Sequence, residues 1–253
     1  MSDLFNLENK VAVVTGASRG LGRAMALGLA GAGADIVAIA STSENAAETA
    51  KDVEALGRRA VAIGCRQDDP AEVERAVDES IAAFGQVDIL VNNAGIIRRA
   101  PAEDYSDDDW SAVMDTNLTG VFQLCRGVGK HMLERGSGKI INIASLLSFS
   151  GGITVPAYAA SKGAVMQLTK ALANEWASKG IQVNAIAPGY FATDNTEALR
   201  ADATRNEAIL ARIPTGRWGE AEDMQGAIVF LASAASDYVN GHILTVDGGW
   251  MAR

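Results

Sequence analysis

Residues 15–22 read Thr15-Gly16-Ala17-Ser18-Arg19-Gly20-Leu21-Gly22, and this glycine-rich turn decides the fold. It lies between the apolar run 10–15, which has the composition of a strand, and an alanine-rich segment near 21–32 with a helical periodicity. Glycine lets the backbone turn tightly and approach a pyrophosphate, while the first amides of the following helix attract negative charge. The spacing Gly-x-x-x-Gly-x-Gly differs from the commoner Gly-x-Gly-x-x-Gly, but its place between a strand and a helix predicts a dinucleotide site.

The alternation of strand and helix patterns continues along the chain. Further strand patterns lie at 35–40, 60–64, 87–91, 139–144, 182–187 and 242–246, separated by helix patterns near 45–56, 70–84, 107–135, 157–178 and 222–232. This order predicts an α/β fold, a doubly wound parallel sheet of about seven strands with helices on both faces. Residues 189–219 contain helical pieces but no strand pattern, which is typical of a lid. We expect a single domain over residues 1–253 with a substrate lid at about 189–219.

Composition and charge narrow the classes of function. The chain has 253 residues, of which 48% are hydrophobic and 21% charged, as in ordinary globular proteins. No stretch approaches the ~20 apolar residues that span a bilayer, and the N-terminal residues lack the pattern of a secretion signal, so we expect a cytoplasmic protein. The net charge of −9 disfavours nucleic acids and membranes as partners. The cysteines and histidines lack the spacing of metal ligands, and we expect no metal.

Tyr158 and Lys162 are four residues apart on the helix pattern 157–178 and therefore share one helix face. A cation beside a phenol stabilises the phenolate and lowers its pKa, which makes tyrosine a better general base near neutral pH. Ser145 follows the apolar run 139–144, so a parallel sheet places it at the carboxyl edge, where ligands bind. These residues predict a hydroxyl donor and a base facing one crevice, although Ser145 would also suit a helix cap.

Together, the motifs resemble those of the short-chain dehydrogenases/reductases over nearly the whole chain. They are the turn at 15–22, Asn92-Asn93-Ala94-Gly95, Asn117, Ser145, Tyr158 with Lys162, and Pro188-Gly189 through Thr193. The resemblance implies an NAD(P)-dependent oxidoreductase with a Rossmann-type sheet of order 3-2-1-4-5-6-7. It also implies a homotetramer, with residues 247–250 near its interfaces.

The same resemblance implies a role for each member of the catalytic group. Tyr158 exchanges the substrate proton and Ser145 polarises the substrate oxygen. Lys162 lowers the tyrosine pKa and binds the nicotinamide ribose, with oxidised nicotinamide adding positive charge. Asn117 positions a water in a proton relay behind the lysine; an alternative use for this asparagine is to bond and kink its own helix.

A set of cofactor contacts also follows from the resemblance: Gly16, Ser18, Arg19, Gly20, Leu21, Gly22, Ser41, Gln67, Asp68, Asn93, Ala94, Gly95, Tyr158, Lys162, Pro188, Gly189 and Thr193. Family members that select NAD usually carry an acidic residue at the end of strand two, where this chain has Ser41 and Thr42. These hydroxyls and Arg19 are available to a 2′-phosphate. Near the adenine, Gln67 or Asp68 stands in place of the usual aspartate. We expect NAD(H) or NADP(H), with a small preference for NAD.

Further stretches are similar to a narrower group of sugar-acid dehydrogenases: 92–99, 147–152, 173–176, 184–190, 213–219 and 236–250. This similarity implies an anionic small substrate of the 2-deoxy-D-gluconate or 2-dehydro-3-deoxy-D-gluconate type, whose reacting oxygen Ser145 and Tyr158 would hold. A carboxylate needs a cationic partner. The candidates, in the loop after strand four or in the lid, are Arg98, Arg99, Arg205 and Arg217. Two alternatives stay open: a 3-oxoacyl carrier-protein reductase, which shares the core motifs, and a dinucleotide-sensing protein without turnover.

Overall fold

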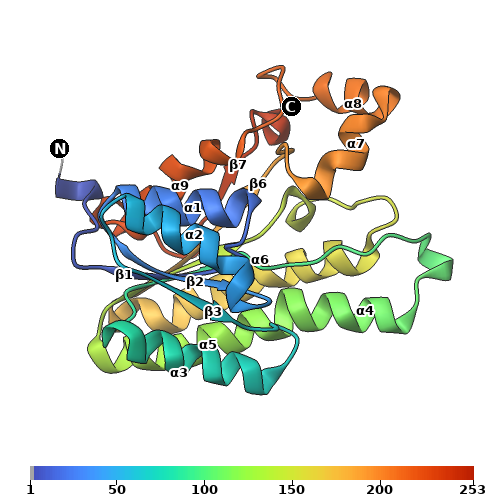
Figure 1. Ribbon diagram of the computed structural model, residues 1–253. Helices are drawn as coiled ribbons and strands as arrows, with labels where there is room; N and C mark the ends of the chain where they lie inside the picture. The colour runs from blue at the N-terminus through green and yellow to red at the C-terminus, as the bar shows by residue number, and fades with distance from the viewer. Residues whose placement is uncertain (1–2) are drawn as a thin grey trace.

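The computed structural model describes residues 3–253; Met1 and Ser2, part of the N-terminal stretch without a secretion pattern, lie outside the described residues. Its centre is one seven-stranded sheet in the order β3-β2-β1-β4-β5-β6-β7, with every neighbouring pair parallel (Figure 1). The strands are β1 Val11–Thr15, β2 Asp35–Ala40, β3 Ala60–Gly64, β4 Ile89–Asn92, β5 Gly138–Ile143, β6 Ile181–Pro188 and β7 Ile243–Val246. The predicted Rossmann-type fold and strand order are confirmed. Because the order reverses between β1 and β4, a crevice opens at their carboxyl ends.

Two layers of helices cover the sheet (Figure 1). One face carries α1 Gly20–Gly31, α2 Ser43–Ala55 and α9 Gln225–Ala232, and the other carries α3 Pro70–Phe84, α4 Asp107–Met114, α5 Gly120–Arg135 and α6 Pro156–Trp176. Strands between two helix layers must be apolar on both sides, and β2 is buried along its whole length. Its Ile36 packs into the core that contains α1 and α9, whereas the next residue, Val37, packs into the core that contains α3 and α5.

The long helix predicted for residues 107–135 is interrupted. The helices α4 and α5 are joined by a π-helical turn, Asp115–Thr119. A π-helical turn accommodates one residue more than an α-helical turn and is frequent at functional sites. Here it holds Asn117, whose side chain bonds the loop after β4. Amphipathic spacing does not reveal the interruption because the helix resumes in the same direction.

Between β6 and α9 the chain leaves the sheet over the segment predicted to be a lid; we keep the name lid for residues 189–219, and its movement over a substrate stays a prediction. It forms a 3-10 turn and two short helices, Asp194–Thr196, α7 Glu197–Ala201 and α8 Ala203–Leu210. One isolated bridge, between Phe191 and Gly219, closes the excursion. The helices stand at the carboxyl edge of the sheet beside the C-terminus (Figure 1). A small apolar cluster holds the segment there, formed by Leu146, Ile209, Ile213, Trp218 and Trp250.

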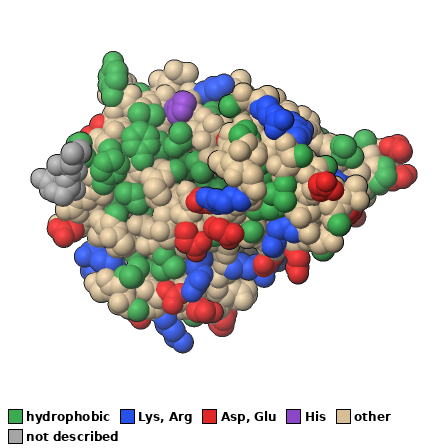
Figure 2. All heavy atoms as spheres, turned by 90° about the horizontal axis from the view of Figure 1, so that it is seen from above, with side chains coloured by type: hydrophobic (Ala, Val, Ile, Leu, Met, Phe, Trp, Pro, Cys, Tyr) green, Lys and Arg blue, Asp and Glu red, His purple; other side chains and the backbone are tan. Residues whose placement is uncertain are grey.

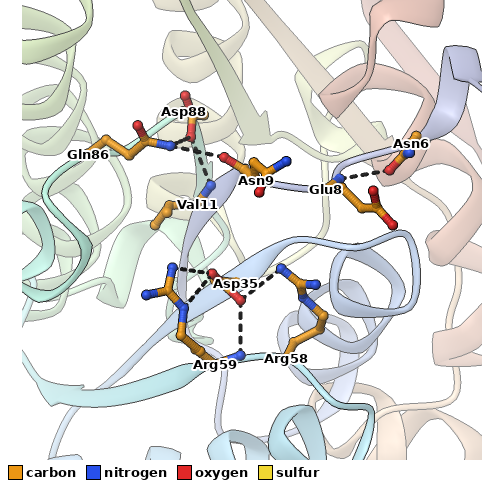
Figure 3. A network of polar contacts seen from close by, with 9 residues as sticks. All are labelled: Asn6, Glu8, Asn9, Val11, Asp35, Arg58, Arg59, Gln86 and Asp88. Carbon is orange, nitrogen blue, oxygen red and sulfur yellow. Dashed lines mark hydrogen bonds and ion pairs between the residues drawn. The ribbon is translucent and has the colours of Figure 1, made fainter.

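Charged side chains anchor the opposite edge of the sheet, where the strands begin (Figure 3). Asp35 accepts hydrogen bonds from the guanidinium of Arg59 at 2.6 and 2.8 Å and from Arg58 at 3.1 Å. Asp88 accepts one from the backbone amide of Val11 at 2.9 Å. Burial raises the pKa of Asp35, but the bonds from Arg59 and the nearby positive charges together outweigh burial, so the pKa is lowered. These carboxylates are used for structure, away from the crevice.

Acidic and basic side chains are interspersed over the face seen from above (Figure 2). A mixed surface of this kind fits an ordinary globular protein of net charge −9. Within residues 3–253, no helix is both long and apolar enough to cross a membrane. In the same part of the chain, no three His, Cys, Asp or Glu side chains are grouped as metal ligands.

Candidate active site

A cavity of about 930 Å³ lies at the carboxyl edge of the sheet. Its walls come from the ends of several strands, from α6 and from the segment after β6. It is lined by every residue of the predicted cofactor set and also by Arg98, Arg99, Ser145 and Arg205. Of the remaining predicted residues, Asn117 is fully buried and Arg217 lines a separate, smaller hollow. The structure therefore brings the predicted residues other than Arg217 to one place, while their roles stay predictions.

The turn after β1 has the shape of a phosphate cradle. A side chain on Gly22 would put its Cβ 2.1 Å from the carbonyl oxygen of Gly16, so only glycine permits this approach. The amide of Asn93 donates to the carbonyls of Thr15 and Gly16 at 2.9 and 3.2 Å, which ties the end of β4 to the turn. No side chain caps the first turn of α1, so its free amides can receive a pyrophosphate.

The end of β2 lacks the acidic residue that selects NAD. Ser41 is exposed and its hydroxyl accepts a hydrogen bond from Asn45 at 3.0 Å. Gln67 is buried, and its amide donates to the backbone of Thr116 at 2.7 Å, whereas Asp68 pairs with Arg66 on the surface. Both adenine candidates line the cavity, and each already has a structural partner.

The start of the lid lies against the phosphate turn. Arg19 pairs with Asp194 at 3.1 Å; both residues line the cavity, and both side chains are exposed. The methyl carbon of Thr193 lies 3.7 Å from the position that a Cβ on Gly20 would take. A cofactor in the cradle would therefore touch the first residues of the lid.

Ser145 serves as a cap and also faces the predicted base. Its hydroxyl accepts a hydrogen bond from the amide of Leu147 at 3.1 Å, at the start of the 3-10 turn Leu146–Ser148. Burial raises the pKa of Tyr158, whereas the nearby Ser145 hydroxyl and the positive charge of Arg99 lower it; burial is the largest effect, so the pKa is raised. The structure thus shows the cap, and the role of Ser145 toward the substrate oxygen stays a prediction.

Lys162 is a buried ammonium beside the tyrosine. Its Nζ lies 5.7 Å from the centroid of the Tyr158 ring and donates to the carbonyl of Ile143 at 2.6 Å. Burial lowers the pKa of Lys162 to about 8, so the charged form still prevails at neutral pH. The lowering of the tyrosine pKa by Lys162 stays a prediction, because the raised pKa of Tyr158 is that of the protein alone.

Asn117 connects the π-helical turn with the loop after β4. Its carbonyl accepts from the amide of Ile96 at 2.8 Å, and its own amide donates to the carbonyl of Ile96 at 2.9 Å. A second, longer bond of 3.3 Å reaches the hydroxyl of Ser161, on the same helix as Lys162. The side chain thus bonds another loop rather than its own helix. Its relay role stays a prediction.

The arginine candidates separate into two groups. Arg98 lines the cavity but pairs with Asp109 at 3.4 Å. Arg217 is held by Asp223 and lines a smaller hollow of about 240 Å³, which removes it from the set of substrate candidates. Arg99 and Arg205 line the main cavity without an acceptor among residues 3–253.

Arg212 and Trp250 are among the cavity residues that lie outside the predicted set. The guanidinium carbon of Arg212 lies 3.9 Å from the centroid of the Trp250 ring. Trp250, expected near subunit interfaces, is only 9% exposed within its own chain. The sequence could have predicted that Trp250 lies at the cavity. Residues 247–250 follow β7, and a parallel sheet brings them to the carboxyl edge that Ser145 occupies.

The chain matches the family model described as short chain dehydrogenase over residues 10–204. It is 56% identical, over the full length of both chains, to a 2-dehydro-3-deoxy-D-gluconate 5-dehydrogenase of Pseudoalteromonas atlantica. Among solved structures, a putative 2-deoxy-D-gluconate 3-dehydrogenase from Agrobacterium tumefaciens with bound NADP is 55% identical, with a TM-score of 0.93 over 99% of each chain. A gluconate 5-dehydrogenase from Burkholderia cenocepacia in complex with NADP and tartrate is 47% identical, with a TM-score of 0.96 over 100% of this chain and 99% of that one.

Proposed function

The chain belongs to the short-chain dehydrogenase family, and we propose that it interconverts a hydroxyl and a keto group on a sugar acid of the 2-deoxy-D-gluconate or 2-dehydro-3-deoxy-D-gluconate type. One observation carries the proposal: a single cavity joins the phosphate cradle to Ser145, Tyr158 and Lys162, and arginines line the same space. The three relatives described above are each named as a dehydrogenase of a sugar acid, which supports the substrate class.

The proton chemistry belongs to Tyr158 and Ser145. Bound NAD(P) supplies the hydride acceptor in oxidation and the hydride donor in reduction. Tyr158 takes the alcohol proton in oxidation and returns it in reduction. The Ser145 oxygen already accepts from the amide of Leu147, so its O–H is free to donate to the substrate oxygen and polarise it.

Lys162 and Asn117 support that proton transfer from behind. One N–H of the Lys162 ammonium is used by Ile143, which leaves two donors for the nicotinamide ribose and a water. Its charge favours the tyrosinate form of Tyr158. A water that donates hydrogen bonds to the carbonyl oxygens of Asn117 and Ile96 would complete the proton relay from Lys162 to solvent.

The expected small preference for NAD stays a prediction, and two observations weigh against it. The solved relatives from Agrobacterium tumefaciens and Burkholderia cenocepacia were obtained with NADP. In this chain Arg19, Ser41 and Thr42 offer partners for a 2′-phosphate. Dissociation constants for NADH and NADPH, measured by fluorescence titration, decide the matter, and a large preference for NADPH would overturn the preference for NAD.

Incubation of the pure protein with both cofactors and a panel of substrates tests the proposed reaction. The panel contains keto sugar acids, neutral sugars and acyl thioesters. We expect turnover of the sugar acids. Activity on thioesters alone would instead indicate a carrier-protein reductase, and cofactor binding without turnover would indicate a sensor.

We also propose a homotetramer of single-domain subunits in the cytoplasm. The family resemblance supports the tetramer, and two large apolar side chains on the α4 and α5 layer, Trp110 and Phe122, are 43% and 40% exposed in the single chain. Light scattering measures the assembly directly, and a monomer at all concentrations would refute it.

A further inference from the structure

We propose that Arg212, packed on the ring of Trp250, binds the carboxylate of the substrate and thereby makes the enzyme selective for an acid over the corresponding uncharged polyol. This inference rests on the proposed function, of which it names the anion-binding residue. Neither Arg212 nor Trp250 belongs to the cofactor or catalytic sets described above.

The first argument concerns which cations are available. Arg19 pairs with Asp194, and Arg98 pairs with Asp109. Within the part of the chain that the structure describes, Arg99, Arg205 and Arg212 line the cavity, and their guanidinium groups have no hydrogen-bond acceptor or carboxylate partner. A substrate carboxylate would therefore find these three donors unoccupied.

The second argument is orientation. The guanidinium of Arg212 lies over the Trp250 ring at 3.9 Å, a stacking distance. A guanidinium that lies on an aromatic face keeps its N–H donors in its own plane, so the edge can offer two parallel hydrogen bonds to a carboxylate. The stack also restricts the side chain before the substrate arrives, which reduces the entropy lost on binding.

Trp250 is itself held firmly. Its ring packs on Tyr190 with centroids 4.6 Å apart, and Tyr190 meets Trp218 edge to face at 5.6 Å. The indole of Trp218 donates to Asn206, on α8, at 2.7 Å. This aromatic column joins the lid to the C-terminal segment, so the ring that supports Arg212 is part of a packed wall.

The backbone beside the stack is closely packed as well. Gly249 has φ 93°, and a Cβ at this position would come within 2.9 Å of Pro214. The amide of Thr215 donates to the carbonyl of Gly248 at 3.1 Å, and Arg253 donates to the carbonyl of Ala211, directly before Arg212. These contacts fix the distance between the Arg212 backbone and the indole.

Neither of the other two free arginines has this support. The positive charge of Arg99 acts on Tyr158, which places it at the reacting end of the cavity. Arg205 and Arg212 are both exposed, but no aromatic ring within residues 3–253 packs on the guanidinium of Arg205, on α8. Of the three arginines, Arg212 is thus the one whose guanidinium is held by a stacking contact.

Calorimetric titration of the binary complex with NADP⁺ tests the inference, using D-gluconate and its uncharged counterpart D-glucitol as probes. We expect Arg212→Gln to weaken gluconate binding about 10- to 100-fold, the range for a charged hydrogen-bonded pair, and to leave glucitol binding unchanged. Arg212→Lys should recover part of the loss, because it keeps the charge but not the two parallel donors. Trp250→Leu should fall between wild type and Arg212→Gln.

Arg217→Gln is the matched control, because Arg217 belongs to the same segment but binds Asp223 outside the cavity. The inference would be overturned if Arg212→Gln bound gluconate as wild type does, or if it lost affinity equally for both probes. It would also be overturned if the wild type showed no preference for gluconate, or if the selective loss occurred in Arg205→Gln instead. In turnover assays Arg212→Gln should have a raised KM for sugar acids and an unchanged kcat. A wild type that binds gluconate through Arg212 but turns over no sugar acid would sink the proposed reaction and leave the anion site standing.

Discussion

The surroundings of Tyr158 have opposing effects on the pKa of its phenol. Burial raises the pKa of its phenol, whereas Ser145 and Arg99 lower it. The raised pKa favours the protonated phenol in the protein alone, and we expect the positive charge of an oxidised cofactor to lower that pKa. Its pair with Lys162 was recognisable from the four-residue spacing, but the dominance of burial was not, because burial depends on the whole fold.

Tyr158→Phe should keep cofactor affinity and lose at least ~100-fold in turnover, the usual scale of general acid–base catalysis. The ring still fills its buried place, but the exchangeable proton is gone. Steady-state rates and NADPH titration of the same preparation measure the two effects. Near-normal turnover would remove the tyrosine from its proposed role.

Lys162 should give the protein a pH-dependent stability. Burial lowers its pKa from 10.5 to about 8, so between these values the unfolded chain binds more protons than the folded one. Stability therefore rises with pH across that window relative to a variant without the amine. We expect the stability difference between wild type and Lys162→Met to shift in favour of wild type from pH 8 to 10, measured by urea unfolding. A difference independent of pH would contradict a buried, titrating ammonium.

At the scale of elements, the patterns that predicted the fold are local. Each strand is a short apolar run, and the phosphate turn joins one such run to a helix, so sequence neighbours alone indicate them. The π-helical turn at Asn117 and the stack of Arg212 on Trp250 depend on residues distant in the chain. Spacing along one helix cannot show a bond to another loop, and the cationic side chains of the lid cannot be ranked until their carboxylate partners are known.

The contact between the phosphate turn and the lid should affect cofactor choice. The carboxylate of Asp194 competes with a 2′-phosphate for Arg19, because both are anions within reach of one guanidinium. An exposed ion pair contributes about 0.2–1 kcal/mol, so Asp194→Asn should tighten NADPH binding by roughly 1.5- to 5-fold. NADH, which lacks this phosphate, should bind as before. Equal changes for both cofactors in fluorescence titrations would show that Arg19 does not meet the 2′-phosphate.

Across the whole molecule, the two edges of the sheet have different uses. The carboxyl edge carries the cavity, which is lined by Arg99, Arg205, Arg212 and a tyrosine of raised pKa. The opposite edge carries paired carboxylates that bond arginines and backbone amides (Figure 3). Because one sheet connects both edges and both apolar cores share its strands, we infer that the subunit unfolds as one unit.

Asp35→Asn tests this separation of uses. Asp35 is buried among Arg58 and Arg59, and its lowered pKa means that its carboxylate stabilises the fold fully above the unfolded value of 3.8. That stabilisation is lost as the pH falls through the lower pKa of the folded state. At pH 7 the free energy of unfolding of Asp35→Asn, measured with urea, should be about 2 kcal/mol lower than that of wild type, the scale of hydrogen bonds to a charged group. This difference should shrink below about pH 4. Cofactor affinity at pH 7 should not change, because the substitution lies at the edge of the sheet opposite the phosphate cradle. Weaker NADPH binding would instead mean that a change at the beginning of the strands affects the site through the sheet.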